Sequence, residues 1–179
     1  MKNIGWLFAL LALFSCNRDS MKKQLSNFIG TEIVFPGNLQ SNLQGRDTLI
    51  HFTDAPMKMV VWYDSVECAS CRIQQLHEWN EIIRYANETG EIFRPVFIFS
   101  PKVNDLHSVN YALHMSDFEH PVYIDKENIF RKNNHGIPPD ERMHTFLLDE
   151  NNKVVLVGSP LRNKPLWELY KEQIESIIQ

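Results

Sequence analysis

Two cysteines three positions apart, Cys68 and Cys71, have the type and spacing needed for thiol chemistry. They follow an apolar run at 58–63 and open a stretch with helical spacing. If the run is a buried strand, Cys68 lies at a helix N-terminus, where unpaired amide groups favour a thiolate over a thiol. Cys71 then lies one turn later, within disulfide reach. We therefore predict a redox-active dithiol with Cys68 as the nucleophile and Cys71 as the resolving thiol.

The elements that must position this pair form an α/β pattern with a mixed sheet. Strands are predicted at 60–63, 92–99 and 121–124, with a hairpin at 145–148 and 154–157. Helices are predicted from residue 72 to a stop at 87–90, from a cap at 104–105 through 113, over 127–133, and from 166 to 177. Pro95 suggests that pairing of its strand starts after it.

The segment before the central strand is predicted to hold a short helix and a hairpin. The helix carries Leu25, Phe28 and Ile29 and stops at Gly30. The hairpin strands are predicted at 32–35 and 48–52, with a long loop at 36–47 that holds Gly, Asn and Ser.

The N-terminus has the features of a secretory signal. Lys2 precedes an apolar stretch at 4–14, which is far short of the ~20 residues of a transmembrane helix. The following Ser15-Cys16 resembles a bacterial lipoprotein signal, which implies that 1–15 are removed and Cys16 is lipidated. A plain secretory signal with a leftover thiol is the alternative. Residues 16–24 are then a tether, and 25–179 form one domain.

Charge and compartment limit the possible partners. The chain has 18 basic and 22 acidic residues and no basic run, so nucleic acid is not an expected partner. A lipidated domain lies outside the cytoplasm, where disulfides persist. The dithiol must then be kept reduced by a partner or act as an oxidant, and neither chemistry requires a cofactor.

Over 25–179 the chain resembles the thioredoxin superfamily, and within it the TlpA/ResA-like membrane-anchored thiol-disulfide oxidoreductases of the bacterial envelope. The strand leading into Cys68-Ala-Ser-Cys71, an insertion at 101–124, the Thr-Phe-Leu-Leu-Asp strand at 145–149 and the N-terminal hairpin carry this resemblance. It implies a thioredoxin-like fold, a mixed central sheet flanked by helices. It also implies a lipid-anchored extracytoplasmic enzyme, with disulfide-bearing envelope proteins and a thiol electron donor as partners. The substrate groove it implies contains Glu67, Ala69, Ser70, Met143 and Thr145.

The sequence departs from the family pattern at several positions. Glu67 replaces the usual Trp, and its charge should raise the pKa of the Cys68 thiol. Trp62 and Gln74 occupy the two positions where the family often has a proton-transferring carboxylate. His144, after Met143, replaces the family's cis-proline, and we expect a trans peptide there because a cis bond before a non-proline residue costs ~3 kcal/mol.

His144 supports three hypotheses. It can be a loop residue with no chemical role, an acid or base for Cys68, or a third metal ligand with Cys68 and Cys71 for Cu(I) or Zn²⁺. The cysteines themselves can be redox-active, inert, or part of such a metal site. The alternatives to an oxidoreductase are therefore a non-catalytic thioredoxin-fold module that binds Cu, Zn or a peptide, and an envelope scaffold lipoprotein.

Overall fold

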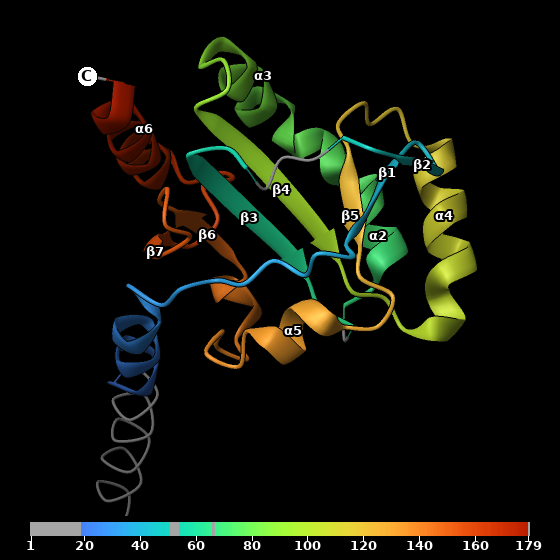
Figure 1. Ribbon diagram of the computed structural model, residues 1–179, viewed down its shortest axis with the longest axis horizontal. Helices are drawn as coiled ribbons and strands as arrows, with labels where there is room; N and C mark the ends of the chain where they lie inside the picture. Colours follow the sequence, from blue (N-terminus) through green and yellow to red (C-terminus); the bar gives the residue numbers. More distant parts are fainter. Residues whose placement is uncertain (1–18, 51–53, 66, 179) are drawn as a thin grey trace, which may run out of the picture.

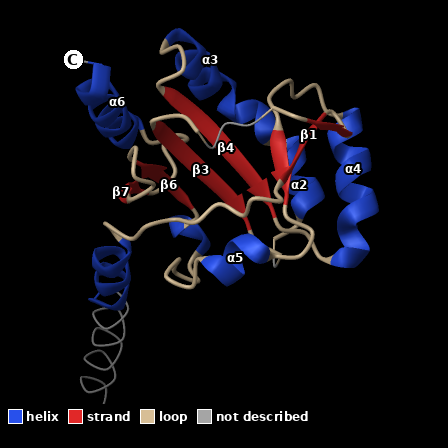
Figure 2. Ribbon diagram, viewed as in Figure 1, coloured by secondary structure: helices blue, strands red, loops and turns tan. Residues whose placement is uncertain are grey.

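A single seven-stranded mixed sheet organises the computed structural model, which describes residues 19–50, 54–65 and 67–178 (Figures 1 and 2). Its strands are β1 (Gln40–Leu43), β2 (Arg46–Thr48), β3 (Met57–Tyr63), β4 (Phe93–Phe99), β5 (Val122–Ile124), β6 (Thr145–Leu148) and β7 (Val154–Val157). The spatial order is β2-β1-β5-β4-β3-β6-β7. β3, β4 and β5 are parallel, and the other neighbouring pairs are antiparallel. The predicted α/β class with a mixed sheet is confirmed.

Helices cover both faces of this sheet. They are α2 (Ala69–Gln74), α3 (Asn80–Glu88), α4 (Leu106–Met115), α5 (Ile129–Asn133) and α6 (Lys164–Ile178), with 3-10 turns η1 (Leu76–Trp79), η2 (Val103–Asp105) and η3 (Glu141–Met143). Residues 19–28 are also helical. α2, α3, α4 and α6 bury their apolar side chains on one face, and α5 and the 19–28 helix bury theirs on the other.

The central strand β3 is buried on both faces. Its alternate side chains enter different cores: Val61 packs with the α2 side of the sheet, whereas Val60 and Trp62 pack with the α5 side. Val61 is paired with Phe97 of β4 and Thr145 of β6. The apolar run at 58–63 therefore has the composition of a strand with no solvent-facing side. The segment leading to Cys68 begins at the end of this strand, which packing holds in place on both faces.

The helix predicted after the cysteines is interrupted. α2 gives way to η1 at Gln75, whose N–H bonds to the carbonyl of Arg72, 3.0 Å away. The tighter winding continues until α3 begins, and it keeps both Leu76 and Trp79 buried. The spacing of apolar residues predicted the buried face but not this change of winding.

The N-terminal hairpin lies at a different place from the prediction. β1 and all of β2 except Thr48 fall inside the segment predicted to be a loop, and Gln44 and Gly45, both with positive φ, form the two-residue turn between them. Glu32 forms only an isolated bridge with Lys153. The strands are polar and are held by side-chain bonds, such as Ser41 Oγ to the Thr48 carbonyl at 2.6 Å. Residues 51 and 52, the end of the other predicted strand, lie outside the described residues.

Pro95 lies within β4 and does not precede it. It is in register with Met59 of β3. The prediction that pairing starts after Pro95 is wrong, because Pro95 is already paired with β3. On the other side of β4, β5 reaches only Phe97–Phe99, so Pro95 has no strand neighbour there. A missing backbone N–H is tolerated at such a position.

The helix at 19–28 extends into the segment predicted to be a tether. Phe28 contacts Phe146 edge to face, with ring centroids 5.1 Å apart, and Gly30 ends the turn with φ +81, as the sequence predicted. The predicted signal at 1–15 and the predicted lipidation site Cys16 lie outside the described residues. Within the described part of the chain, no helix is both long enough and apolar enough to span a bilayer.

Candidate active site

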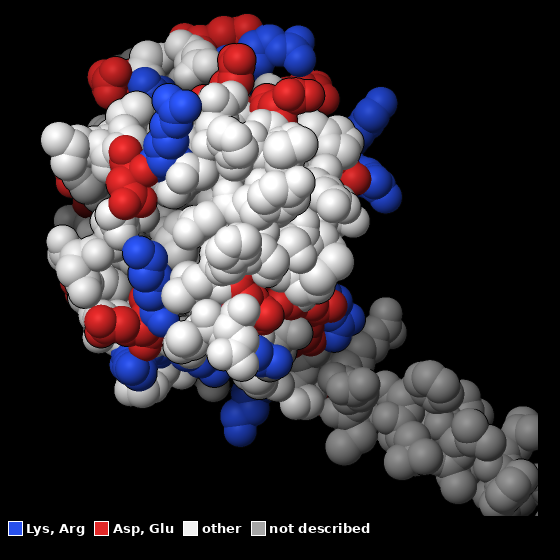
Figure 3. Space-filling view, turned by 90° about the vertical axis from the view of Figure 1, so that its right-hand side faces the viewer, with Lys and Arg blue, Asp and Glu red and all other residues white. Residues whose placement is uncertain are grey.

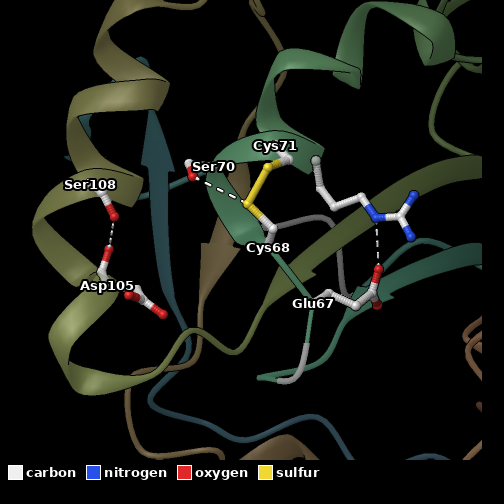
Figure 4. The surroundings of a disulfide bond; sticks show 7 residues. Glu67, Cys68, Ser70, Cys71, Asp105 and Ser108 are labelled. Carbon is white, nitrogen blue, oxygen red and sulfur yellow. Dashed lines mark hydrogen bonds and ion pairs between the residues drawn. A yellow bond between two sulfur atoms is a disulfide. The ribbon is translucent and has the colours of Figure 1, made fainter.

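The dithiol lies at the junction of β3 and α2. Cys68 is the N-cap residue of α2, with extended backbone angles, and its carbonyl accepts the first helical bond from Arg72 N at 3.0 Å. Cys68 and Cys71 form a disulfide with their Cα atoms 5.3 Å apart (Figure 4). The predicted placement at a helix N-terminus and the predicted disulfide reach are both confirmed.

Both cysteine residues are exposed. Their helix is held to the core by Ala69 and Ile73, which are buried between and after them. Cys68 Sγ lies 3.6 Å from Ser70 Oγ (Figure 4). The disulfide is therefore presented at the surface by a helix whose opposite side is fixed, which is the arrangement needed for attack by another thiol.

Glu67 does not place an isolated negative charge beside Cys68. Its side chain is only 7% exposed, and its Oε2 lies 2.8 Å from Arg72 Nε (Figure 4). Its Oε1 accepts a bond from Asp64 N at 3.3 Å, and Arg72 has a second, longer ion pair of 3.6 Å with Glu141. Because the positive charge of Arg72 offsets the negative charge of Glu67, Glu67 destabilises a Cys68 thiolate less than its position in the sequence alone suggests.

His144 is buried, with 3% of its surface exposed. Its Nε2–H donates to the Pro138 carbonyl at 3.0 Å, and its ring packs on Trp62 with centroids 4.4 Å apart. Burial lowers its pKa, so the ring is neutral at neutral pH. Its Nδ1 is a buried acceptor without a hydrogen-bond partner among the described residues. The peptide bond before His144 is trans, as predicted.

The three residues proposed as metal ligands are not brought together. His144 packs on Trp62 and lines a cleft together with Glu67 and Arg72, but neither Cys68 nor Cys71 lines that cleft. No group of three His, Cys, Asp or Glu side chains in the described ranges has an arrangement that could hold a metal ion. The geometry therefore gives no support to the metal hypothesis for Cys68, Cys71 and His144.

Behind Trp62 lies a buried carboxylate that sequence reasoning missed. Trp62 Nε1–H donates to Ser100 Oγ at 3.0 Å, and Ser100 donates to Asp125 Oδ2 at 3.3 Å. The same Asp125 carboxylate accepts bonds from the backbone N–H groups of Ile129 and Phe130 at the start of α5. The position of this Asp between a predicted strand and a predicted short helix was the sequence feature that could have predicted this capping role.

The predicted groove residues divide between two sides of α2. Glu67 and Thr145 line a cleft of about 380 Å³, which we call the charged cleft because it also contains Arg72, Arg142 and other charged residues. Ser70 lines a different depression on the side of α4. Ala69 and Met143, predicted to line the groove, are buried instead.

Comparison with known proteins gives structural matches only. No family model matches the chain, and no curated protein matches it. Among solved structures, a candidate thiol:disulfide interchange protein DsbE from Chlorobium tepidum is similar with a TM-score of 0.52 and 18% identity, over 82% of this chain and 96% of that chain. At this identity the match shows the fold alone, which is thioredoxin-like as predicted.

Two further solved structures have lower scores. The thioredoxin domain of a thiol-disulfide oxidoreductase from Bacteroides vulgatus has a TM-score of 0.49 and 14% identity, over 82% of this chain and 97% of that chain. StoA from Bacillus subtilis has a TM-score of 0.48 and 17% identity, over 72% of this chain and 92% of that chain.

Proposed function

We propose that this thioredoxin-fold chain is a thiol-disulfide oxidoreductase that exchanges or reduces disulfides of other proteins through Cys68 and Cys71. The observation that carries the proposal is the exposed disulfide at the start of α2, directly after a strand buried on both faces. A disulfide that closes so short a loop adds little to the free energy of unfolding, which argues against a structural role. Its exposed position makes it accessible to other thiols and favours a chemical role.

The reaction consists of two thiol-disulfide exchanges. In the reduced protein, the Cys68 thiolate attacks one sulfur of the substrate disulfide, which forms a mixed disulfide and releases the first substrate thiolate. Cys71, as a thiolate, then attacks Cys68 Sγ, which forms the Cys68–Cys71 disulfide and releases the second substrate thiolate. Two electrons and two protons pass to the substrate, and an external thiol donor returns them to the protein.

Local geometry supports Cys68 as the attacking residue. Its position at the N-terminus of α2 places the unpaired amide groups of the first turn near its sulfur. The Glu67–Arg72 ion pair joins the residues before and after the dithiol and limits the electrostatic penalty on the thiolate. The mechanism requires only the two cysteines, and an acid or base role for His144 stays a prediction.

The cellular setting is also a proposal. The similar solved structures include a candidate thiol:disulfide interchange protein, and the sequence at 1–16 resembles a lipoprotein signal. We infer a lipid-anchored, extracytoplasmic protein whose partners are disulfide-bearing envelope proteins and a thiol electron donor. Labelling cells with radioactive palmitate tests the anchor: the natural chain should carry label and a Cys16→Ser chain should not. An unlabelled natural chain would favour the plain secretory signal.

The function is tested by a redox equilibrium. The full-length Cys16→Ser chain is equilibrated, metal-free and in mild detergent, with defined thiol/disulfide buffers, and free thiols are counted by alkylation. We expect a reversible two-electron transition between about −120 and −270 mV. The additional change Cys68→Ser provides the control and should abolish it. Absence of a reversible transition in this window would contradict the proposal and favour a binding module or a scaffold.

A further inference from the structure

A groove separates α2 and its continuation from α4. It has a volume of about 570 Å³ and lies on the side of α2 opposite to the charged cleft. Ser70 and Ile73 form one wall, and Ser108, Tyr111 and Met115 of α4 form the other. Asp117 is the single Asp, Glu, Lys or Arg among its lining residues. The two depressions beside the dithiol therefore differ sharply in charge.

The α4 wall exposes large apolar side chains. α4 already uses Val109 and Leu113 to pack on the sheet, yet Tyr111 is 61% exposed and Met115 is 64% exposed. No Lys, Arg, Asp or Glu occurs in α4. Figure 3 faces this side of the molecule and shows a broad uncharged area bordered by charged side chains. The helix thus has a second apolar face that the described part of the chain leaves open to solvent.

This groove begins beside the reactive disulfide. Ser70 lines the groove, and its Oγ lies 3.6 Å from Cys68 Sγ. Ser108 of α4 lies across from Ser70 (Figure 4). A polypeptide whose cysteine reacts with Cys68 can therefore continue into the groove, where its next residues meet Tyr111 and Met115. The reaction itself requires the partner's reactive sulfur to lie against Cys68 Sγ, which is next to Ser70 in the wall of the groove.

We propose that the groove between α2 and α4 binds the segment that flanks the reactive cysteine of the partner protein, and that it selects partners with uncharged, apolar residues there. This inference rests on the proposed function and adds the substrate class to it. Asp117 is the single charged side chain that lines the groove, so charged flanking residues would lose hydration with at most one ion pair in return. Tyr and Met are typical of interface centres, and a flexible Met side chain adapts to several partner side chains.

Two probe peptides test the selection. Each carries one cysteine as a mixed disulfide with thionitrobenzoate, flanked on both sides either by Phe and Leu or by Glu and Lys. The reduced full-length Cys16→Ser chain attacks this disulfide and releases coloured thionitrobenzoate, so stopped-flow absorbance gives the rate. We expect the apolar peptide to react roughly tenfold faster than the charged one, the effect of burying about one apolar side chain.

Variants assign the preference to the groove. Tyr111→Ser together with Met115→Ser should reduce the preference to less than about twofold, while Leu169→Ser should leave it unchanged. Leu169 is a matched control because it is an exposed apolar residue, 48% exposed, on α6. Circular dichroism confirms that each variant is folded. Equal rates for the two peptides, or a preference that survives the Tyr111 and Met115 changes, would overturn the proposal.

A small disulfide separates this proposal from the proposed function. Thionitrobenzoate dimer is too small to extend along the groove, so all folded variants should react with it at the same rate. If the chain reacts with neither the small disulfide nor the peptides, the oxidoreductase function fails and the groove proposal fails with it. If it reacts normally with the small disulfide but shows no peptide preference, only the groove proposal fails.

Discussion

Arg72 Nε lies 2.8 Å from Glu67 Oε2, so the residue immediately after Cys71 is paired with the residue immediately before Cys68. The pair closes across the first turn of α2 and fixes the orientation of the loop that enters it. Glu67 is almost fully buried and Arg72 is partly exposed. A carboxylate next to the nucleophile is compatible with redox chemistry because its charge is offset within the same turn.

Arg72→Ala should make the protein a stronger reductant and a slower nucleophile. Without Arg72, the Glu67 carboxylate disfavours a Cys68 thiolate, which destabilises the reduced form relative to the disulfide. If the reduced form is destabilised relative to the disulfide form by roughly 1 kcal/mol, the reduction potential should fall by about 10–30 mV. Measurement against glutathione buffers gives the potential. Arg142→Ala is the control because Arg142 lines the same cleft but pairs with Asp140.

Glu67→Gln provides the opposite test of this ion pair. It removes the negative charge and leaves Arg72 near the dithiol, so the potential should rise and attack at neutral pH should become faster. A fall in potential for both Arg72→Ala and Glu67→Gln would show that the pair acts by holding the loop and not by its charge.

Cys71→Ser should trap a mixed disulfide on Cys68. Without the resolving thiol the intermediate persists, so non-reducing electrophoresis of cells that express the variant should show adducts that disappear on reduction. Cys68→Ser is the matched control and should trap at least tenfold less, because its remaining thiol is not at the helix N-cap. Equal trapping by the two variants would contradict the assignment of Cys68 as the nucleophile.

His144→Phe should affect stability more than chemistry. The aromatic ring keeps its contact with Trp62, while the Pro138 carbonyl loses its donor, at a cost of about 1 kcal/mol in the free energy of unfolding. We expect the rate of reaction with a small disulfide to stay within twofold of the natural rate. A loss of 100-fold or more, together with a changed pH profile, would instead establish the acid–base hypothesis.

Asp125→Asn should destabilise the fold without changing the redox potential. The carboxylate accepts bonds from Ser100 Oγ and from the N–H groups of Ile129 and Phe130, and an amide cannot accept all three. We expect the free energy of unfolding in urea to fall by about 2 kcal/mol. Glu119→Gln, at an exposed position, is the control and should have little effect.

Acid should destabilise the protein through His120. Burial lowers the pKa of His120 from 6.5 to about 4, with Nε2 bonded to the Pro95 carbonyl at 3.0 Å. Between these pH values the unfolded chain binds a proton and the folded chain does not, so the free energy of unfolding falls as pH falls. The loss from His120 should total about 3 kcal/mol.

Comparison with His120→Gln isolates this effect. The amide can still donate to Pro95 but does not titrate, so the difference in free energy of unfolding between the natural chain and the variant should change steadily from pH 6.5 to 4. A difference independent of pH would show that folding does not lower the pKa of His120. His144, whose pKa is also lowered, adds a loss of the same sign in both proteins.

The sequence by itself determined the class of fold and the position of the dithiol. The apolar run at 58–63 and the helical spacing after Cys71 depend on residues that are close neighbours in the chain, so local periodicity predicts them. The same holds for the hairpin of β6 and β7 and for the buried residues of α6. Polar strands such as β1 and β2 lack this signal because side-chain bonds, and not apolar alternation, hold them.

The tertiary structure decided which side chains meet. His144 contacts Trp62, and Asp125 reaches Trp62 through Ser100, because the sheet order brings β3, β4 and the loops after β5 together. The two unlike depressions beside the dithiol likewise depend on how α4 packs against α2. Such contacts join residues far apart in the chain, and local spacing carries no information about them because it does not specify which strands and helices become neighbours.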